Sequence, residues 1–176
     1  INGEVCYEGI GCSNYADAQR FVFWASMLSG AAGHTYGADG VWQVNCKDYV
    51  FGASPQGVMW GSADWKYAYS LPGSIQLGIA KKILEQYDWW NFEPHTDWCE
   101  PHAENDNHLA PYAAGIAGKV RIIFIPFCSA KPVVKNIEKD ISYRAFYVNI
   151  INGDVYPIGD VTPDEDGKWK PERPVP

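Results

Sequence analysis

The stretch that decides the fold is AAGHTY at residues 31–36, which reads as a short strand, small at its start and polar at its end. Upstream, EVCYE at residues 4–8 reads as a second short strand that runs into a glycine loop. Between them, residues 15–29 carry apolar side chains at helical spacing, and Gly30 is placed to end this helix in a left-handed turn. Strand, helix, strand is the order of a parallel crossover, so the opening of the chain is predicted to be α/β.

The next segments extend this α/β part. Residues 38–69 lack apolar periodicity, which predicts a long loop of the kind that usually serves function. Residues 70–87 are predicted to form a second helix, with Ser70 as its cap and Pro72 in its first turn.

The pattern changes after this helix. Residues 88–118 are polar, aromatic and proline-bearing, which indicates a boundary between domains. Beyond it, residues 120–125 and 143–151 read as strands, and Asn152 with Gly153 predicts a type I′ hairpin. This second part is predicted to be antiparallel β.

Composition narrows the classes of partner. The chain has 176 residues, a net charge of -7 and 15% aromatic residues. The negative charge argues against nucleic acid and anionic membranes as partners, and no apolar run approaches the roughly 20 residues of a membrane span. Neutral ligands such as sugars fit better, and the sequence leaves the cellular compartment open.

The cysteines show no CxxC framework of the kind that staples small secreted domains or binds zinc. They are predicted to be isolated buried thiols, and a bridge between Cys12 and Cys46 stays open as the alternative. The five cysteines are Cys6, Cys12, Cys46, Cys99 and Cys128.

Several short motifs together resemble the apiosidase-like family of glycoside hydrolases. In the first half they are GE at 3–4, YE at 7–8, AGHTYG at 32–37, VWQ at 41–43 and LPG at 71–73. In the second half EPH at 100–102, PYAAGI at 111–116, GKVRI at 118–122 and YPIG at 156–159 are similar to the linker and small β-sandwich of that family, a module often labelled collagen-binding. The motifs occur in the family's order along nearly the whole chain.

The resemblance implies a fold of two parts, α/β plus all-β. Residues 1–90 would be the C-terminal part of a (β/α)8 TIM barrel, with 4–8 as its seventh strand and 31–36 as its eighth. Residues 91–114 would be a linker, and residues 115–176 an antiparallel β-sandwich without its last strand. Because a complete barrel needs about 250 residues, the chain is expected to be incomplete at both ends, with strands one to six before Ile1.

Glu8 is the candidate catalytic residue. Glycoside hydrolysis generally needs two carboxyl groups, and the resemblance implies that Glu8 is the nucleophile of a retaining enzyme. The acid/base would stand on a missing upstream strand, since Glu4 is expected at the buried start of its strand and Asp39 and Asp64 in the long loop. A salt-bridged carboxylate at a strand end is the alternative for Glu8.

Four residues are candidates for substrate binding: His34, Tyr36, Trp42 and Gln43. Side chains at the ends of barrel strands face the active site, which favours His34 and Tyr36. Trp42 offers a flat surface for a sugar ring, and Gln43 offers hydrogen bonds beside it. Internal hydrogen bonding for the first pair and core packing for Trp42 are the structural alternatives.

Polar residues of the linker form the one cluster that resembles metal ligands, but their spacing matches no zinc pattern, so no metal and no other cofactor is predicted. The cluster consists of His95, Cys99, Glu100, His102, Glu104 and His108.

The sequence thus predicts part of a glycosidase that cleaves polysaccharide side chains, with a carbohydrate as its partner. Two alternatives stay open: a carbohydrate- or collagen-binding module without catalysis, and an inactive, truncated relative. A separate chain carrying the rest of the barrel is a further candidate partner.

Overall fold

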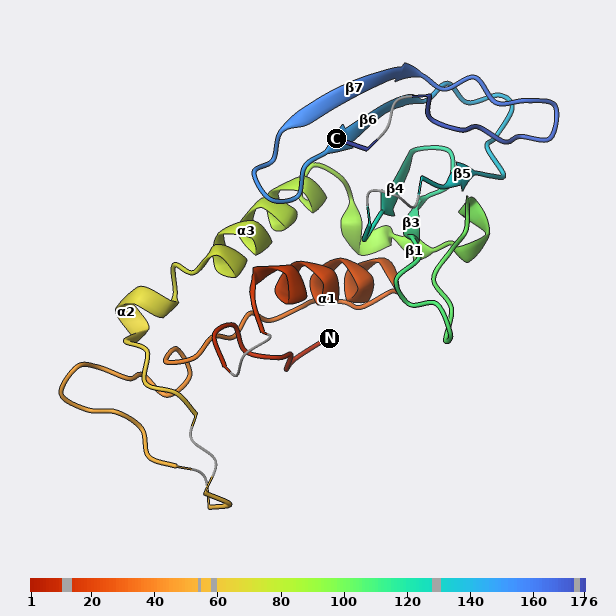
Figure 1. The fold of residues 1–176 in the computed structure, drawn as a ribbon. Coiled ribbons are helices and arrows are strands. Elements are labelled where there is room, and N and C mark those ends of the chain that lie inside the picture. The colour runs from red at the N-terminus through yellow and green to blue at the C-terminus, as the bar shows by residue number, and fades with distance from the viewer. Residues whose placement is uncertain (11–13, 54, 58–59, 128–130, 173–174) are drawn as a thin grey trace.

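The computed structural model describes residues 1–10, 14–53, 55–57, 60–127, 131–172 and 175–176. Figure 1 shows two long helices in the middle, a loop that extends to one side and small β-sheets on the other. The alternative of a bridge between Cys12 and Cys46 lies outside the described residues because Cys12 does. Cys99 is a buried thiol as predicted, whereas Cys46 is exposed, so that part of the prediction is wrong.

Helices α1 (Ala16–Leu28) and α3 (Pro72–Leu84) pack against each other, and both were predicted. Gly30 has a φ of 91°, the left-handed conformation expected after α1. The predicted cap of α3 is wrong: Leu71 is its N-cap residue, and Ser70 donates its hydroxyl to the carbonyl of Tyr67 over 2.9 Å. Helix α2 (Trp65–Ala68) is a short turn within the long loop.

The predicted parallel pairing occurs at two isolated bridges, Asn2 with His34 and Glu8 with Ala38. Five residues lie between the bridges on the first segment, 3–7, but only three on the second, 35–37. This mismatch prevents a continuous ladder, so the regular strands predicted at 4–8 and 31–36 do not form. The (β/α)8 barrel therefore stays a prediction.

The second half is antiparallel β, as predicted, in three small sheets. The first contains β1 (Glu93–Pro94), β3 (Tyr112–Ile116) and β4 (Val120–Phe124) in the order β1-β3-β4. The others pair β2 (Cys99–Glu100) with β5 (Val133–Val134) and β6 (Arg144–Val148) with β7 (Val155–Asp160). Two 3-10 turns, η1 (Trp89–Asn91) and η2 (Thr96–Trp98), separate the first strands.

The turn between β6 and β7 differs from the expected type. A type I′ turn needs a positive φ at both central residues, and here Gly153 has one but Asn152 does not. Instead, the N–H of Gly153 bonds the carbonyl of Asn149 over 2.7 Å, which makes a wider turn.

One apolar core joins the two halves of the chain. Trp24 of α1 stacks on Phe124 of β4 with ring centroids 6.2 Å apart, and Leu84 of α3 lies in the same buried cluster. Each such side chain stabilises the fold by about 1.5–3 kcal/mol when fully buried. Residues of the expected linker also form strands β1 and β2. The domain boundaries near residues 90 and 114 and the β-sandwich stay predictions.

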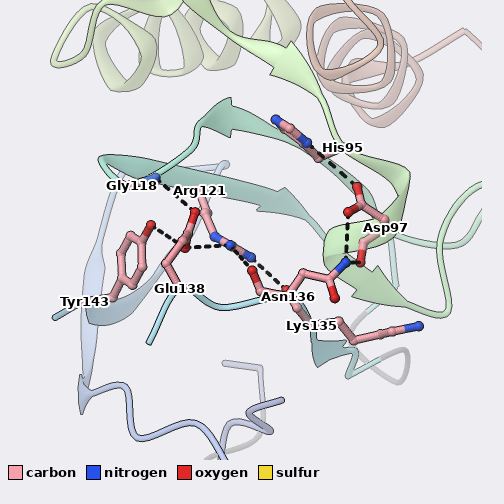
Figure 2. A network of polar contacts seen from close by, with 8 residues as sticks. All are labelled: His95, Asp97, Gly118, Arg121, Lys135, Asn136, Glu138 and Tyr143. Carbon is pink, nitrogen blue, oxygen red and sulfur yellow. Dashed lines mark hydrogen bonds and ion pairs between the residues drawn. The ribbon is translucent and has the colours of Figure 1, made fainter. Parts of the chain in front are cut away.

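Arg121 of β4 organises the polar side of the second half (Figure 2). Its guanidinium lies 4.1 Å from the centre of the Trp98 ring, and Nη2 lies 2.7 Å from Oε2 of Glu138. The same oxygen accepts the Tyr143 hydroxyl over 2.9 Å, and Oε1 accepts the N–H of Gly118 over 3.0 Å. This network ties β4 to the segment before β6.

None of the helices in the described parts of the chain has the length and apolar character that crossing a bilayer requires.

Candidate functional site

Glu8 lies between the two helices, with its carboxylate enclosed by its own chain. Its side chain is only 4% exposed. Oε2 accepts the hydroxyl of Tyr36 over 2.6 Å, and Oε1 accepts the backbone N–H of Gly73 over 3.1 Å. Gly73 belongs to the first turn of α3, where N–H groups have no partner within the helix and the helix dipole favours a negative charge.

Glycine is required at position 73 because the carboxylate occupies the place of a side chain. A Cβ added there would lie 2.2 Å from Oε2 of Glu8 and 3.0 Å from Cγ of Gln19. Gln19 is fully buried on α1 and donates its amide to the carbonyl of Cys6. The segment before Glu8 is thereby fixed to α1, and Glu8 itself to α3.

Tyr36, which is partly buried, completes this group through its hydrogen bond to Glu8. Burial, with Glu8 as the second cause, raises the pKa of the Tyr36 phenol. The phenol therefore keeps its proton and acts as the donor. Its role in substrate binding stays a prediction.

His34 lies apart from the carboxylate. Its ring packs edge-on against Phe23 of α1, with centroids 5.3 Å apart, and among the described residues neither ring nitrogen has a hydrogen-bond partner. Burial lowers the pKa of His34, so its imidazole is neutral near pH 7. Substrate contact by His34 stays a prediction, and in this structure the ring faces a helix.

Glu8 was predicted to be the catalytic nucleophile, which needs access to substrate, and in this structure it is buried. Cys6, Glu8 and Tyr36 all contact the helices or the core around them. Tyr7, between Cys6 and Glu8, packs instead against Gly37 and Trp42.

Tyr7 lies flat across Gly37 and reaches Glu4. A Cβ at Gly37 would stand 2.2 Å from Cδ1 of Tyr7, so only glycine permits this position of the ring. The Tyr7 hydroxyl donates to Oε1 of Glu4 over 2.9 Å. This hydrogen bond is the largest cause of the raised pKa of Tyr7. Glu4 was expected at a buried strand start, and this expectation is wrong: its side chain is exposed.

An aromatic surface adjoins Tyr7. Trp42 has its ring centroid 6.2 Å from that of Tyr7, 5.2 Å from Phe51 and 5.6 Å from Trp60. Trp42 and Phe51 are each 41% exposed. We refer to Tyr7, Trp42, Phe51 and Trp60 as the aromatic cluster. Trp42 is thus partly exposed, and its stacking on a sugar stays a prediction.

The side chain of Gln43 forms hydrogen bonds within the long loop and does not reach the surface. Its side chain is 6% exposed, Oε1 accepts the N–H of Gly40 over 2.9 Å, and Nε2 donates to the carbonyl of Trp60 over 3.2 Å. Both polar ends are occupied, which leaves little to offer a substrate. Asp39 is also buried, which raises its pKa, and Asp64 accepts the N–H of Lys66 at the start of α2.

The polar residues of the linker are dispersed into separate contacts. His95 stacks on Trp98 with centroids 3.7 Å apart, His102 pairs with Glu104 over 3.1 Å, and Glu100 pairs with Lys135 over 2.9 Å. Within the described ranges, no three His, Cys, Asp or Glu side chains gather closely enough to hold a metal ion.

Sequence reasoning missed Tyr7 and Gly37 as members of a site. The spacing of Glu4 and Tyr7 is the only signal in the sequence, and it does not by itself say that both side chains reach the same side of the segment.

Comparisons with known proteins agree with the motifs. The family model of the apiosidase-like catalytic domain matches residues 1–91. A solved structure described as a glycoside hydrolase is similar over 99% of this chain and 38% of its own, with a TM-score of 0.70 and 17% identity. A glycoside hydrolase family 5 structure from Bacteroides vulgatus ATCC 8482 is similar over 96% of this chain and 37% of its own, with a TM-score of 0.67 and 15% identity.

These likenesses support the fold, and the chain spans less than two fifths of either solved structure. No curated protein matches the chain.

Proposed function

The chain belongs to the apiosidase-like family, and from this premise we propose that it is the C-terminal part of a glycosidase that hydrolyses O-glycosidic bonds of a carbohydrate. The observation that carries the proposal is the exposed carboxylate of Glu4 beside the aromatic cluster. Carboxyl groups perform glycoside cleavage, and aromatic faces bind the apolar faces of sugar rings. On the family resemblance we propose polysaccharide side chains as the substrate class.

A second carboxyl group is needed, and we propose that polypeptide outside this chain provides it. One group protonates the leaving oxygen, and the other acts as nucleophile in a retaining enzyme or as base in an inverting one. The small share of the solved structures that this chain covers supports this division. We favour the retaining mechanism on the family resemblance.

The assignment of Glu8 as nucleophile stays a prediction, and its surroundings argue against it. Both of its oxygens accept hydrogen bonds from the protein, and the side chain is almost inaccessible. Further polypeptide packed around this chain would increase that burial and not reduce it.

The test is an assay of the natural polypeptide at its full length with 4-nitrophenyl glycosides of pyranoses and furanoses in both anomeric forms. We expect release of 4-nitrophenol from at least one substrate and none from the 176-residue chain alone. NMR of the first-formed sugar would give the stereochemical outcome. A natural polypeptide without activity on any glycoside would favour the inactive relative.

A binding role of the β6–β7 hairpin is the second candidate. Three of its apolar side chains are well exposed: Phe146 at 45%, Val155 at 58% and Tyr156 at 39%. Titration calorimetry of the chain with oligosaccharides and collagen peptides tests this role, and Phe146→Ala with Val155→Ala, two side chains on one face of the hairpin, should abolish any heat. The absence of heat with every ligand would exclude it.

A further inference from the structure

We propose that Gln43 and Asn45 are positioning residues for the aromatic cluster: each holds the backbone of one aromatic neighbour of Trp42, and together they determine how tightly a sugar ring binds there. This inference rests on the proposed function and deepens it, because it assigns the residues that set the affinity for the substrate.

Buried polar side chains are concentrated at the start of the long loop. Of the six buried polar or charged residues in the described parts of the chain, three lie within residues 39–45, namely Asp39, Gln43 and Asn45. Their exposed fractions are 8%, 6% and 0%. Burial of such groups is costly unless hydrogen bonds replace their water. Buried polar groups whose bonds are made fix the backbone around them, which indicates that these side chains specify the shape of the loop.

Gln43 holds the backbone of Trp60. Its Nε2 donates to the carbonyl of Trp60 over 3.2 Å, and its Oε1 accepts the N–H of Gly40 over 2.9 Å. The amide therefore connects the outgoing and the returning branch of the loop. The Trp60 ring meets Trp42 edge to face, with centroids 5.6 Å apart and an angle of 82° between the planes. The bond from Gln43 thus sets where this indole contacts Trp42.

Asn45 holds the backbone of Phe51 in the same way. Its Oδ1 accepts the N–H of Phe51 over 2.8 Å, and its own carbonyl accepts the N–H of Trp65 over 2.9 Å. The Phe51 ring lies 5.2 Å from the ring of Trp42, at an angle of 63°. Both aromatic neighbours that the long loop supplies to Trp42 are therefore attached through their own peptide groups to a buried amide.

Close contact between the two branches of the loop supports this assignment. A Cβ at Gly61 would lie 2.2 Å from Oδ2 of Asp39, and a Cβ at Gly40 would lie 2.1 Å from the carbonyl oxygen of Ala63. Both glycines have a positive φ, 91° and 88°. Oδ2 of Asp39 also accepts the N–H of Ala63 over 3.4 Å. The returning branch therefore has little freedom to move away, and Trp60 directly precedes Gly61.

Such an arrangement affects the binding of a sugar more than its cleavage. Rings that are already in place around Trp42 spare a ligand the loss of side-chain freedom that binding would otherwise require. This gain is the same for the substrate and for the transition state, so its loss raises KM and leaves kcat unchanged. A group that takes part in bond cleavage would instead lower kcat.

Kinetics and circular dichroism of the natural full-length polypeptide test the inference, with the 4-nitrophenyl glycoside that the wild type hydrolyses. We expect Gln43→Met, which removes both side-chain hydrogen bonds, and Asn45→Ala each to raise KM about 10-fold with kcat within about twofold. Two indoles in contact couple their electronic transitions, so Gln43→Met should lose the same dichroism signal as Trp60→Phe. Gln86→Met is the matched control at an exposed glutamine and should keep the wild-type KM.

A double-mutant cycle shows whether Gln43 acts through Trp60. In that case Gln43→Met should raise KM no further once Trp60→Ala is present, so that the two effects are not additive. For the second pair, Asn45→Asp keeps the oxygen that accepts the N–H of Phe51. It should recover most of the affinity that Asn45→Ala loses, which a residue that only fills space would not do.

Gln43→Glu keeps the bond to Gly40 and loses the donor to Trp60, and it takes the place of Gln43→Met in all measurements if that variant does not fold. An unchanged KM, additive effects in the cycle, or a fall in kcat at unchanged KM would overturn the inference while the proposed function stands. A wild-type polypeptide inactive on every glycoside would overturn both.

Discussion

The hydroxyl of Tyr36 donates a 2.6 Å hydrogen bond to Oε2 of Glu8, at the point where the chain passes between α1 and α3. The same carboxylate accepts the N–H of Gly73 at the start of α3. One buried charge therefore joins the segment before α1, the segment after it and the last helix. A buried carboxylate is tolerated only when such donors replace water. The two hydrogen bonds to Glu8 therefore stabilise the packing of these three segments.

Replacement of Glu8 should destabilise the fold. In Glu8→Ala the Gly73 N–H and the Tyr36 hydroxyl lose their acceptor, and we expect a loss of about 2–4 kcal/mol in the free energy of unfolding. Urea unfolding followed by tryptophan fluorescence measures this loss. Glu85→Ala is the matched control, because its side chain is 52% exposed and pairs with Lys81, 3.5 Å away. Equal stability of the two variants would contradict a stabilising role of the Glu8 hydrogen bonds.

Alkaline pH should reduce the stability that Tyr36 contributes through its hydrogen bond to Glu8. The pKa of Tyr36 is raised above its ordinary value of 10.0, so the unfolded phenol ionises at a lower pH than the folded one. This group's contribution to stability is complete below about pH 10 and is lost as the pH rises further. Urea midpoints between pH 8 and 11 should fall less steeply in Tyr36→Phe than in the wild type. Tyr15→Phe, at a position 59% exposed, serves as the control and should follow the wild type.

A methyl group at Gly37 should disturb Tyr7. The Cβ of Gly37→Ala would stand 2.2 Å from the Tyr7 ring, which must move and carry its hydroxyl away from Glu4. We expect a loss of about 1–3 kcal/mol in stability and, in the natural polypeptide, at least a 10-fold loss in kcat. The Cβ of Gly33→Ala meets only Ile1, at 3.9 Å, and this control should stay close to the wild type. Unchanged kcat in Gly37→Ala would argue against a role for Tyr7.

Arg121 should matter more than any surface arginine. Its side chain is 7% exposed and lies between the Trp98 ring and Glu138, so Arg121→Ala removes packing and leaves Glu138 without its ion pair. We expect a loss of about 2–4 kcal/mol, since Glu138 keeps some access to water. Arg144→Ala breaks an ion pair whose partners are 81% and 84% exposed, and it should cost less than about 1 kcal/mol. Thermal unfolding compares the two, and similar losses would contradict the role of the network.

Local pattern was sufficient where an element depends on its own residues. The helical spacing of Phe21, Trp24 and Leu28 predicted α1, and the β-rich second half followed from its apolar runs and turn residues. Helix caps and turn types were less predictable. Helix α3 begins after Leu71, whose backbone is extended, and not after the serine before it. The β6–β7 turn is closed by the hydrogen bond from the N–H of Gly153 to the carbonyl of Asn149, which spans more residues than a type I′ turn.

The candidate site, like the fold, was only partly predictable from the sequence. The motifs identified the family and selected both Glu8 and Tyr36 as site candidates, and the structure joins these two side chains by a hydrogen bond. They gave no means to tell which carboxylate reaches solvent. That distinction depends on α1 and α3, which enclose Glu8 and leave Glu4 outside.

The sequence by itself determined the family, the two main helices and the antiparallel character of the second half, because these follow from residue order and spacing. Only the tertiary structure decided the environment of each carboxylate. Burial is a property of what packs against a residue from elsewhere in the chain: Gly73 stands 65 positions from Glu8 and Gly37 stands 30 from Tyr7. Contacts across such separations leave no local pattern, yet they set which acid is held in the interior and which can meet a sugar.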